Sequence, residues 1–308
     1  MIAIIGPTGS GKTEISVKIS DCLPISVINA DSRQVYKYMN IGTAKPTLDQ
    51  QNKLDHYVLD KVNPDINYNL NNFIKDSNYA INKIKSQKKT PIIVGGTGLY
   101  VWALIDKWAL PDVPPDKDFR KNIEFEIHTN GIKYIQSLFV KEVGESVSTK
   151  FDLNNIRRLI RYLEIIKSIG KEKFLDSSKP KCNNNLIFGL DYSKDNQEEH
   201  ITNRIEKMIG NGWIAEVEML IKKGYNLSHH SMSGIGYKEI YLYLCNEIGY
   251  NEMKENTLKR TFSLIKKQRT WFKKTDSRIK WLDSDIKSRD INEISKSILQ
   301  YNKNTTQL

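Results

Sequence analysis

The sequence predicts an α/β fold in which a parallel sheet is flanked by helices and carries an inserted all-helical domain. A short apolar run at residues 2–5 leads into the motif G-x-x-x-x-G-K-[ST], which is followed by a helix-like pattern. Further apolar runs at residues 25–28, 91–94 and 186–190 have the length and continuity of strands that are buried on both faces. Apolar residues recur at helical spacing across residues 117–173. Together these patterns are typical of a P-loop NTPase-like sheet with a helical insertion.

The length, the apolar runs, the cysteines and the charge of the chain limit the classes of function that it can have. The 308 residues suffice for one large domain or two small ones, and no apolar run approaches the ~18 residues that span a bilayer. The N-terminus lacks the basic and apolar segments of a secretory signal, so we expect a cytoplasmic protein. Cys22, Cys182 and Cys245 form no CxxC pair, and we expect them to be packing residues. The 47 Lys and Arg against 36 Asp and Glu, a net charge of +11, favour a polyanionic partner, although many soluble proteins are simply rich in Lys.

The Gly-rich loop follows the first predicted strand. It comprises Gly6, Pro7, Thr8, Gly9, Ser10, Gly11, Lys12 and Thr13. Glycines let the backbone curl so that its N–H groups face an anion at the positive end of the next helix. Lys12 supplies a positive charge for phosphate oxygens, and the Thr13 hydroxyl can hold Mg²⁺. The loop predicts binding of a di- or triphosphate, ATP among the candidates, without specifying which.

Two P-loop classes are weakly supported. Residues 52–55 match the guanine-reading pattern N-K-x-D, but no apolar strand precedes them, so we interpret the match as chance. The Asp that usually holds Mg²⁺ after a second strand is also missing, because residues 91–94 run into Gly95-Gly96-Thr97-Gly98. A small-molecule kinase remains an open alternative.

Five further blocks carry a more specific resemblance. They are NADSRQVY at residues 29–36, IGTAKP at 41–46, GGTGLY at 95–100, GYKE at 236–239 and KQRTWF at 267–272. With these blocks in this order, the sequence resembles the tRNA dimethylallyltransferase (isopentenyl-tRNA transferase) family from residue 6 to about residue 281. No zinc-finger spacing follows, so it is similar to the bacterial-type short form.

The resemblance implies a reaction and its partners. Family members transfer a dimethylallyl group from dimethylallyl diphosphate to the exocyclic amine of the adenosine adjacent to the anticodon in tRNA, and release diphosphate. It implies the tRNA anticodon stem-loop and dimethylallyl diphosphate as partners, Mg²⁺ as cofactor, no membrane association and a monomer. Two alternatives remain: an adenylate (cytokinin-type) isopentenyltransferase, and a P-loop small-molecule kinase.

Candidate catalytic residues follow two of the predicted strands. Asp31 lies just beyond residues 25–28, at the edge of the sheet where ligands bind, and the resemblance implies that it is the general base. Its alternative is a helix N-cap with Gln34 at capping distance. We expect Thr97 to hydrogen-bond the target nucleotide, although it could also cap a helix beginning near Leu99. By resemblance alone, Arg120 reaches the active site beside Thr97.

The predicted tRNA contacts fall in two segments: Asp31, Ser32, Arg33 and Gln34 in the first, and Arg157, Arg158, Leu159, Ile160 and Arg161 in the second. The arginines of the second segment form a basic stripe that could hold phosphates, or else a solvated surface. Family members usually carry Asp where Asn155 stands, which leaves a charge-pairing role there open.

Proline-rich residues 111–115 predict a stiff linker into the insertion. We expect a P-loop core domain formed by residues 1–112 and 185–308, and a helical insertion at residues 113–184 that has three or four helices and contacts tRNA. The aromatic residues Trp213, Trp271 and Phe272 are expected to pack in the core, and residues 301–308 to fray.

Overall fold

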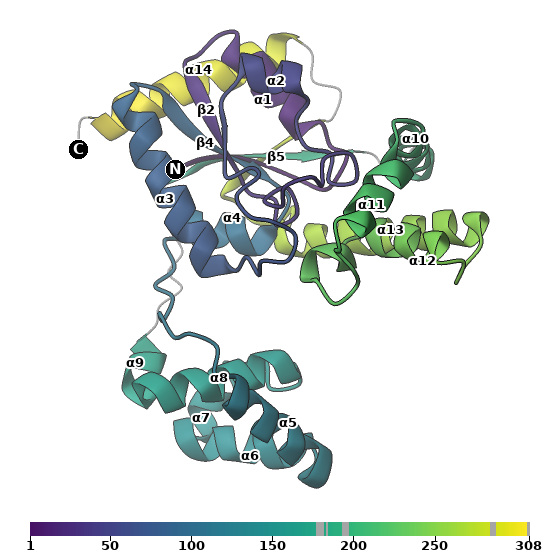
Figure 1. Cartoon of the computed structure of the whole chain (residues 1–308). Coiled ribbons are helices and arrows are strands. Elements are labelled where there is room, and N and C mark those ends of the chain that lie inside the picture. Colours follow the sequence, from purple (N-terminus) through teal and green to yellow (C-terminus); the bar gives the residue numbers. More distant parts are fainter. Residues whose placement is uncertain (177–181, 183, 193–196, 284–287, 307–308) are drawn as a thin grey trace. The chain divides into compact units, whose positions relative to one another are not determined.

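The computed structural model describes residues 1–176, 182, 184–192, 197–283 and 288–306 (Figure 1). The chain divides into two compact units. Unit 1 comprises Met1–Ile105 and Cys182–Leu308, and unit 2 comprises Asp106–Lys181. Unit 2 begins before the Pro-rich segment because that segment packs with the insertion: Val113 is buried in the core of unit 2, and its carbonyl accepts a hydrogen bond from Arg161 Nη2 at 2.8 Å.

Unit 1 is built on a parallel sheet of six strands in the order β3-β2-β4-β1-β5-β6. The strands are β1 (Ile2–Ile5), β2 (Ile25–Asn29), β3 (His56–Tyr57), β4 (Thr90–Gly95), β5 (Leu186–Asp191) and β6 (Ile279–Asp283). The four central strands are the predicted ones, and each is apolar because both of its faces are covered. Unit 2 interrupts the chain between β4 and β5, which pair with β1 on its two sides. The predicted parallel α/β class is confirmed.

Helices cover both faces of this sheet (Figure 1). On one face α1 (Lys12–Ser20) and α14 (Ser288–Thr306) pack against the strands, with Ile15, Ile19 and Ile298 in one apolar cluster. On the other face lie α3 (Leu70–Ser86) and α4 (Gly98–Ile105), joined by a stacked pair of rings, Phe73 and Tyr100, with centroids 4.2 Å apart. α2 (Leu48–Lys53) precedes β3.

A second helical group follows β5. It consists of α10 (Gln197–Gly210), α11 (Trp213–Lys222), a short 3-10 helix η1 (His230–Ser233), α12 (Tyr237–Leu244) and α13 (Tyr250–Trp271). Trp213 and Phe272 are buried as predicted, but Trp271 is 37% exposed, so its predicted place in the core is wrong. A Cβ added at Gly98 would lie 2.3 Å from Trp271 Cγ, so the indole packs against the start of α4 instead.

Two smaller predictions also fail. Cys22 and Cys245 are exposed and therefore are not packing residues. The tail is helical as far as Thr306, because Ile294 and Ile298 bury one face of α14. The Tyr301 hydroxyl also accepts a 2.5 Å hydrogen bond from the amino group of Met1. Residues 307 and 308 lie outside the described part.

All of the regular secondary structure in the described part of unit 2 is helical. Its helices are α5 (Lys117–Asn130), α6 (Ile132–Val143), α7 (Glu145–Ser148), α8 (Ile156–Ile169) and α9 (Lys171–Asp176), and the two short ones bring the number above the three or four predicted. Ile135, Phe139, Leu159 and Phe174 form its core. Within the described part of the chain, no helix is both long and apolar enough to cross a membrane.

Candidate active site

The P-loop connects β1 to α1 and leaves the first turn of α1 open to a ligand. Gly9 and Gly11 adopt φ of 86° and 78°, the left-handed region that glycine tolerates. Gly11 is the N-cap of α1 and offers no side-chain acceptor to the first turn. The N–H groups there therefore remain available to an anion at the positive end of the helix.

Lys12 folds back over this loop. Its Nζ donates hydrogen bonds to Gly6 O at 3.1 Å and Pro7 O at 2.7 Å. Burial lowers the pKa of Lys12 to about 8; Asp31 opposes that shift, and Arg204 adds to it. Among the residues that the structure describes, the ammonium group has no direct anionic partner, and an anion bound in the loop would stabilise its charged form.

Two cavities meet beside the loop. The first, about 600 Å³, is lined by the P-loop, the carboxyl ends of β2 and β4, and α10. The second, about 480 Å³, is lined by the loop after β4, by residues near Ser233, and by α13. Both cavities are lined by Thr8, Asp31, Thr43, Arg204 and Met208. Asp31 therefore lies at the junction between a phosphate-binding loop and a second pocket.

Asp31 follows β2 in a turn, not at the start of a helix. Its Oδ1 accepts a 2.8 Å hydrogen bond from Arg33 N, and residues 31–36 are not helical, so the helix N-cap alternative is wrong. The side chain is only half-buried, which leaves the carboxylate accessible from the cavities.

Thr97, which follows the neighbouring strand β4, stabilises the turn that contains Asp31. Its Oγ1 accepts a 3.1 Å hydrogen bond from Ser32 N, and its carbonyl accepts from Tyr100 N and Val101 N at the start of α4. The hydroxyl therefore holds the segment that carries Asp31, while the helix-capping alternative applies only to the carbonyl.

Gln268 joins two loops of the site. Its Oε1 accepts from Thr8 N at 2.9 Å, and its Nε2 donates to Gly96 O at 3.1 Å. Gln268 is 7% exposed and comes from α13, far along the chain from both loops. One buried amide thus fixes the P-loop against the loop that contains Thr97.

Sequence reasoning missed Arg204, His200 and Gln268. Arg204 lines both cavities, and burial lowers the pKa of its guanidinium while Tyr192 and Asp31 raise it. The His200 ring nitrogen Nε2 lies 3.1 Å from Gly9 O. A signal was present in α10, where polar residues recur at helical spacing at positions 200, 204 and 207, on a different face from the buried Ile201 and Ile205.

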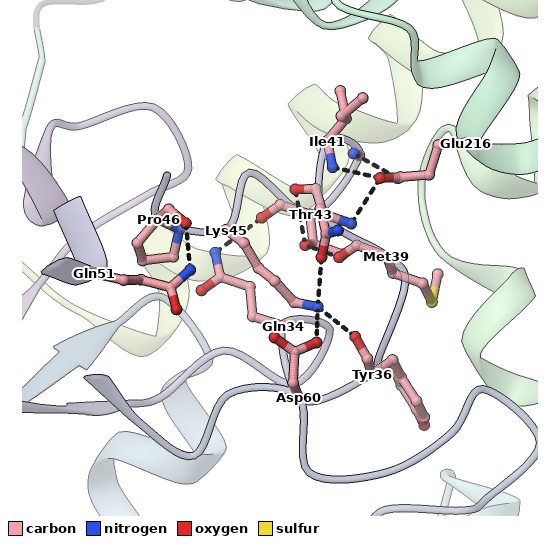
Figure 2. A network of polar contacts seen from close by, with 12 residues as sticks. Gln34, Tyr36, Met39, Ile41, Thr43, Lys45, Pro46, Gln51, Asp60 and Glu216 are labelled. Carbon is pink, nitrogen blue, oxygen red and sulfur yellow. Dashed lines mark hydrogen bonds and ion pairs between the residues drawn. The ribbon is translucent and has the colours of Figure 1, made fainter. Parts of the chain in front are cut away.

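The first group of predicted tRNA-binding residues is held largely by the protein itself. Gln34 is 8% exposed, and its Nε2 donates to Thr43 O and Ala44 O at 2.9 and 3.0 Å (Figure 2). Arg33 Nη1 donates to His230 O at 2.8 Å. Ser32 and Arg33 line the second cavity, whereas Gln34 lines the first and also supports the loop at residues 39–46 through its amide (Figure 2).

Arg120 and Arg161 share one buried carboxylate in unit 2. Arg120 donates to both oxygens of Glu164 at 2.8 Å, and Arg161 pairs with the same group. Burial alone would raise the pKa of Glu164, but the hydrogen bonds from Arg120 and Arg161 lower it to about 2. These two arginines are therefore parts of a structural cluster on α5 and α8.

The remaining residues of the second group differ in exposure. Arg157 and Arg158 are exposed, and Arg158 pairs with Asp152 at 3.3 Å. Leu159 and Ile160 are 0% and 5% exposed and face the interior, so we leave their side chains out of any RNA-contacting surface. Asn155 is the N-cap of α8, because its side chain accepts from Arg158 N at 3.2 Å.

The fold and the site define a P-loop α/β protein with a second pocket beside its phosphate loop. A sequence model described as IPP transferase matches residues 34–275. The chain is 36% identical over 302 residues to a tRNA dimethylallyltransferase of Natranaerobius thermophilus, which covers 96% of this chain and 88% of that relative. The chain therefore belongs to the IPP transferase family.

Two solved structures resemble the whole chain. A full-length tRNA isopentenylpyrophosphate transferase from Bacillus halodurans aligns with a TM-score of 0.73 and 31% identity, covering 99% of this chain and 97% of that one. A eukaryotic dimethylallyltransferase acting on tRNA aligns with a TM-score of 0.82 and 27% identity, covering 100% of this chain and 79% of that one.

Proposed function

We propose that this protein transfers a dimethylallyl group from dimethylallyl diphosphate to the exocyclic amine of the adenosine adjacent to the anticodon in tRNA, releasing diphosphate. Membership of the IPP transferase family supports this function. The observation that carries it is the place of Asp31, whose carboxylate lies where the P-loop cavity meets the second pocket. An acid–base group at that junction can act between a phosphate-bearing donor and an acceptor that enter from different sides.

The P-loop side fits the diphosphate. The N–H groups of the first turn of α1, the ammonium of Lys12 and the guanidinium of Arg204 surround the first cavity. Negative charge builds on the leaving oxygen as the carbon–oxygen bond breaks, so preorganised donors stabilise the transition state more than the substrate. We assign Gly6, Pro7, Thr8, Gly9, Ser10, Gly11, Lys12 and Thr13 to this role.

The Thr13 hydroxyl lines the same cavity and would hold Mg²⁺. Among the described residues, no three His, Cys, Asp or Glu side chains gather into a metal site. A single hydroxyl donor from Thr13 fits a cation that takes most of its ligands from phosphate oxygens and water, as Mg²⁺ commonly does. Bound there, Mg²⁺ would neutralise charge on the diphosphate.

The second pocket fits the acceptor nucleotide. The adenine amine approaches Asp31 from this side, and its nitrogen forms a bond to the first carbon of the dimethylallyl group while the bond from that carbon to the diphosphate oxygen breaks. The nitrogen becomes acidic as it bonds, and Asp31 takes its proton. Thr97 supports this geometry through its hydrogen bond to Ser32 N. The target base has to leave its stack to enter the pocket.

The positive charge of the protein fits the rest of the tRNA. The net charge of +11 favours phosphate contacts, and Arg157 and Arg158 expose their guanidinium groups on α8. We infer that residues of unit 2 contact the anticodon stem-loop, and that the protein acts in the cytoplasm as a monomer. The role of Arg120 at the target nucleotide stays a prediction from family resemblance.

The test is incubation with bulk tRNA and labelled dimethylallyl diphosphate, followed by nucleoside analysis of the tRNA. The expected product is a prenylated adenosine. Label on free adenine nucleotides and none on tRNA would instead indicate an adenylate isopentenyltransferase, and ATP-dependent phosphorylation without prenyl transfer would indicate a kinase.

A further inference from the structure

Asn29 is a buried polar side chain at the floor of the P-loop cavity. It is the last residue of β2, and strand alternation places its side chain on the same face as Ile25 and Val27, which pack in the cluster that contains α1. It is 6% exposed and lines the first cavity together with Lys12, Thr13 and Asp31, but it does not line the second.

The amide nitrogen of Asn29 is unsatisfied. Within the part of the chain that the structure describes, Nδ2 is buried and has no hydrogen-bond partner. Buried donors without partners are rare in folded proteins because they have lost their water, and each calls for an explanation such as a catalytic role or a bound water or ion. A half-turn of the carboxamide exchanges Oδ1 and Nδ2 without a change of volume, so the group can present N–H to the cavity.

We propose that the Asn29 carboxamide donates a hydrogen bond to an oxygen of the diphosphate group in the P-loop cavity. This inference rests on the proposed function, since it assigns a further residue to the same substrate. An N–H donor can bind an anion such as diphosphate. Because the Asn29 amide is neutral, it would add affinity without placing another positive charge beside Lys12 and Arg204. The hydrogen bond strengthens as charge moves onto the diphosphate, so it also favours departure of the leaving group.

The main competitor is a metal-directed role, in which the amide oxygen would face a Mg²⁺ ion or its water. The two roles differ in their response to charge. Asn29→Asp removes the donor and adds a negative charge, which opposes an anion but strengthens a cation ligand. Asn29→Ala removes both possibilities.

The experiment is calorimetric titration of the full chain with inorganic diphosphate in the presence of Mg²⁺ and without tRNA. We expect Asn29→Ala to raise the dissociation constant by about 10- to 100-fold, as for a lost hydrogen bond to a charged group. Asn29→Asp should raise it further. The matched control is Ser77→Ala in α3, which removes another buried group without a partner away from both cavities and should leave the constant unchanged.

Thermal unfolding separates binding from folding. Without ligand, Asn29→Ala should melt no lower than the wild type, since it deletes an unsatisfied group, but diphosphate should stabilise it less. A wild-type constant for Asn29→Ala, or tighter binding by Asn29→Asp, would overturn the inference. Failure of the wild type itself to bind diphosphate would instead contradict the proposed function.

Discussion

The phenol of Tyr237 donates a 2.6 Å hydrogen bond to Glu216 Oε1, and both side chains are buried. The same carboxylate accepts the backbone N–H groups of Asn40, Ile41 and Gly42 at 2.8, 2.7 and 3.2 Å (Figure 2). α11 and α12 thereby hold a loop that follows β2, although these segments are far apart in the sequence. Because Thr43 and Gly42 line the second pocket, this contact helps to shape that pocket, in which we propose that the acceptor nucleotide binds.

Glu216→Gln should disturb that loop. The variant places an amide NH₂ among donors, which breaks at least one hydrogen bond to a buried charged acceptor, and we expect a loss of about 2–4 kcal/mol in unfolding free energy. Urea unfolding measures it. The control is Glu218→Gln on the same helix. The carboxylate of Glu218 is exposed and pairs with Lys222, so this variant should change stability by less than about 0.5 kcal/mol. Equal stability of the two variants would contradict this role for Glu216.

Lys12→Ala should weaken diphosphate binding and leave tRNA binding nearly unchanged. The ammonium lies within the P-loop, so its loss removes a charge-assisted contact to phosphate and should raise the diphosphate dissociation constant by about 10- to 100-fold. Calorimetry with diphosphate and filter binding with tRNA measure the two effects. An equal loss of tRNA affinity would mean that the two substrates do not occupy the cavities as proposed.

The pH dependence of diphosphate binding should report the same lysine. Burial lowers the pKa of Lys12 to about 8 in the free protein, and a bound anion favours the charged form and raises it. Affinity should therefore be greatest below pH 8 and fall as the pH rises through about 8, by at most tenfold per pH unit. Lys12→Ala controls for ionisation of diphosphate itself; a profile identical to the wild type would exclude Lys12 as the titrating group.

Salt dependence tests the basic surface of α8. Each phosphate contact contributes roughly −0.7 to −0.9 to the log–log slope of tRNA affinity against salt. Arg157→Gln with Arg158→Gln should flatten that slope, because both side chains are exposed. Lys171→Gln with Lys173→Gln in α9 provides a charge-matched comparison on the same unit. An unchanged slope in the α8 variant would mean that these arginines are solvated and do not contact tRNA phosphates.

Glu164 should matter for folding of unit 2. Its carboxyl has a pKa lowered to about 2, and the unfolded value is near 4.3, so its stabilising contribution is present above about pH 4 and is lost as the pH falls toward 2. Glu164→Gln should lower protection of α5 and α8 amides in hydrogen exchange at pH 6, since Arg120 and Arg161 lose a buried partner. Glu142→Gln, at an exposed site on α6, is the control, and matching protection in the two variants would contradict the cluster's role.

Local patterns explain which parts of this fold were predictable. The four central strands are continuous apolar runs, and the P-loop is a contiguous motif. Both can therefore be predicted from short continuous stretches of the sequence. β3 has only two residues, and β6 interrupts its apolar residues with Lys280, so neither gives a strand signal.

The site was only partly predictable for a related reason. Asp31 and Thr97 follow strands whose carboxyl ends meet at one sheet edge, so their proximity follows from topology. Gln268 and Glu216 act through contacts across about half the chain or more, with partners that no spacing in the sequence indicates. Trp271 is a large aromatic residue of the kind that usually lies in a core. Its partial exposure results from tertiary packing against Gly98, which the sequence does not indicate.

Single-turnover transfer by Asp31→Asn tests directly whether Asp31 is the general base. Asn keeps the shape and can accept a hydrogen bond, but it cannot take the proton from the adenine amine. We expect the transfer rate to fall by about 10²–10⁴, with tRNA and diphosphate affinities within a few-fold of the wild type. Transfer at the wild-type rate would contradict it and would place the general base elsewhere in the site.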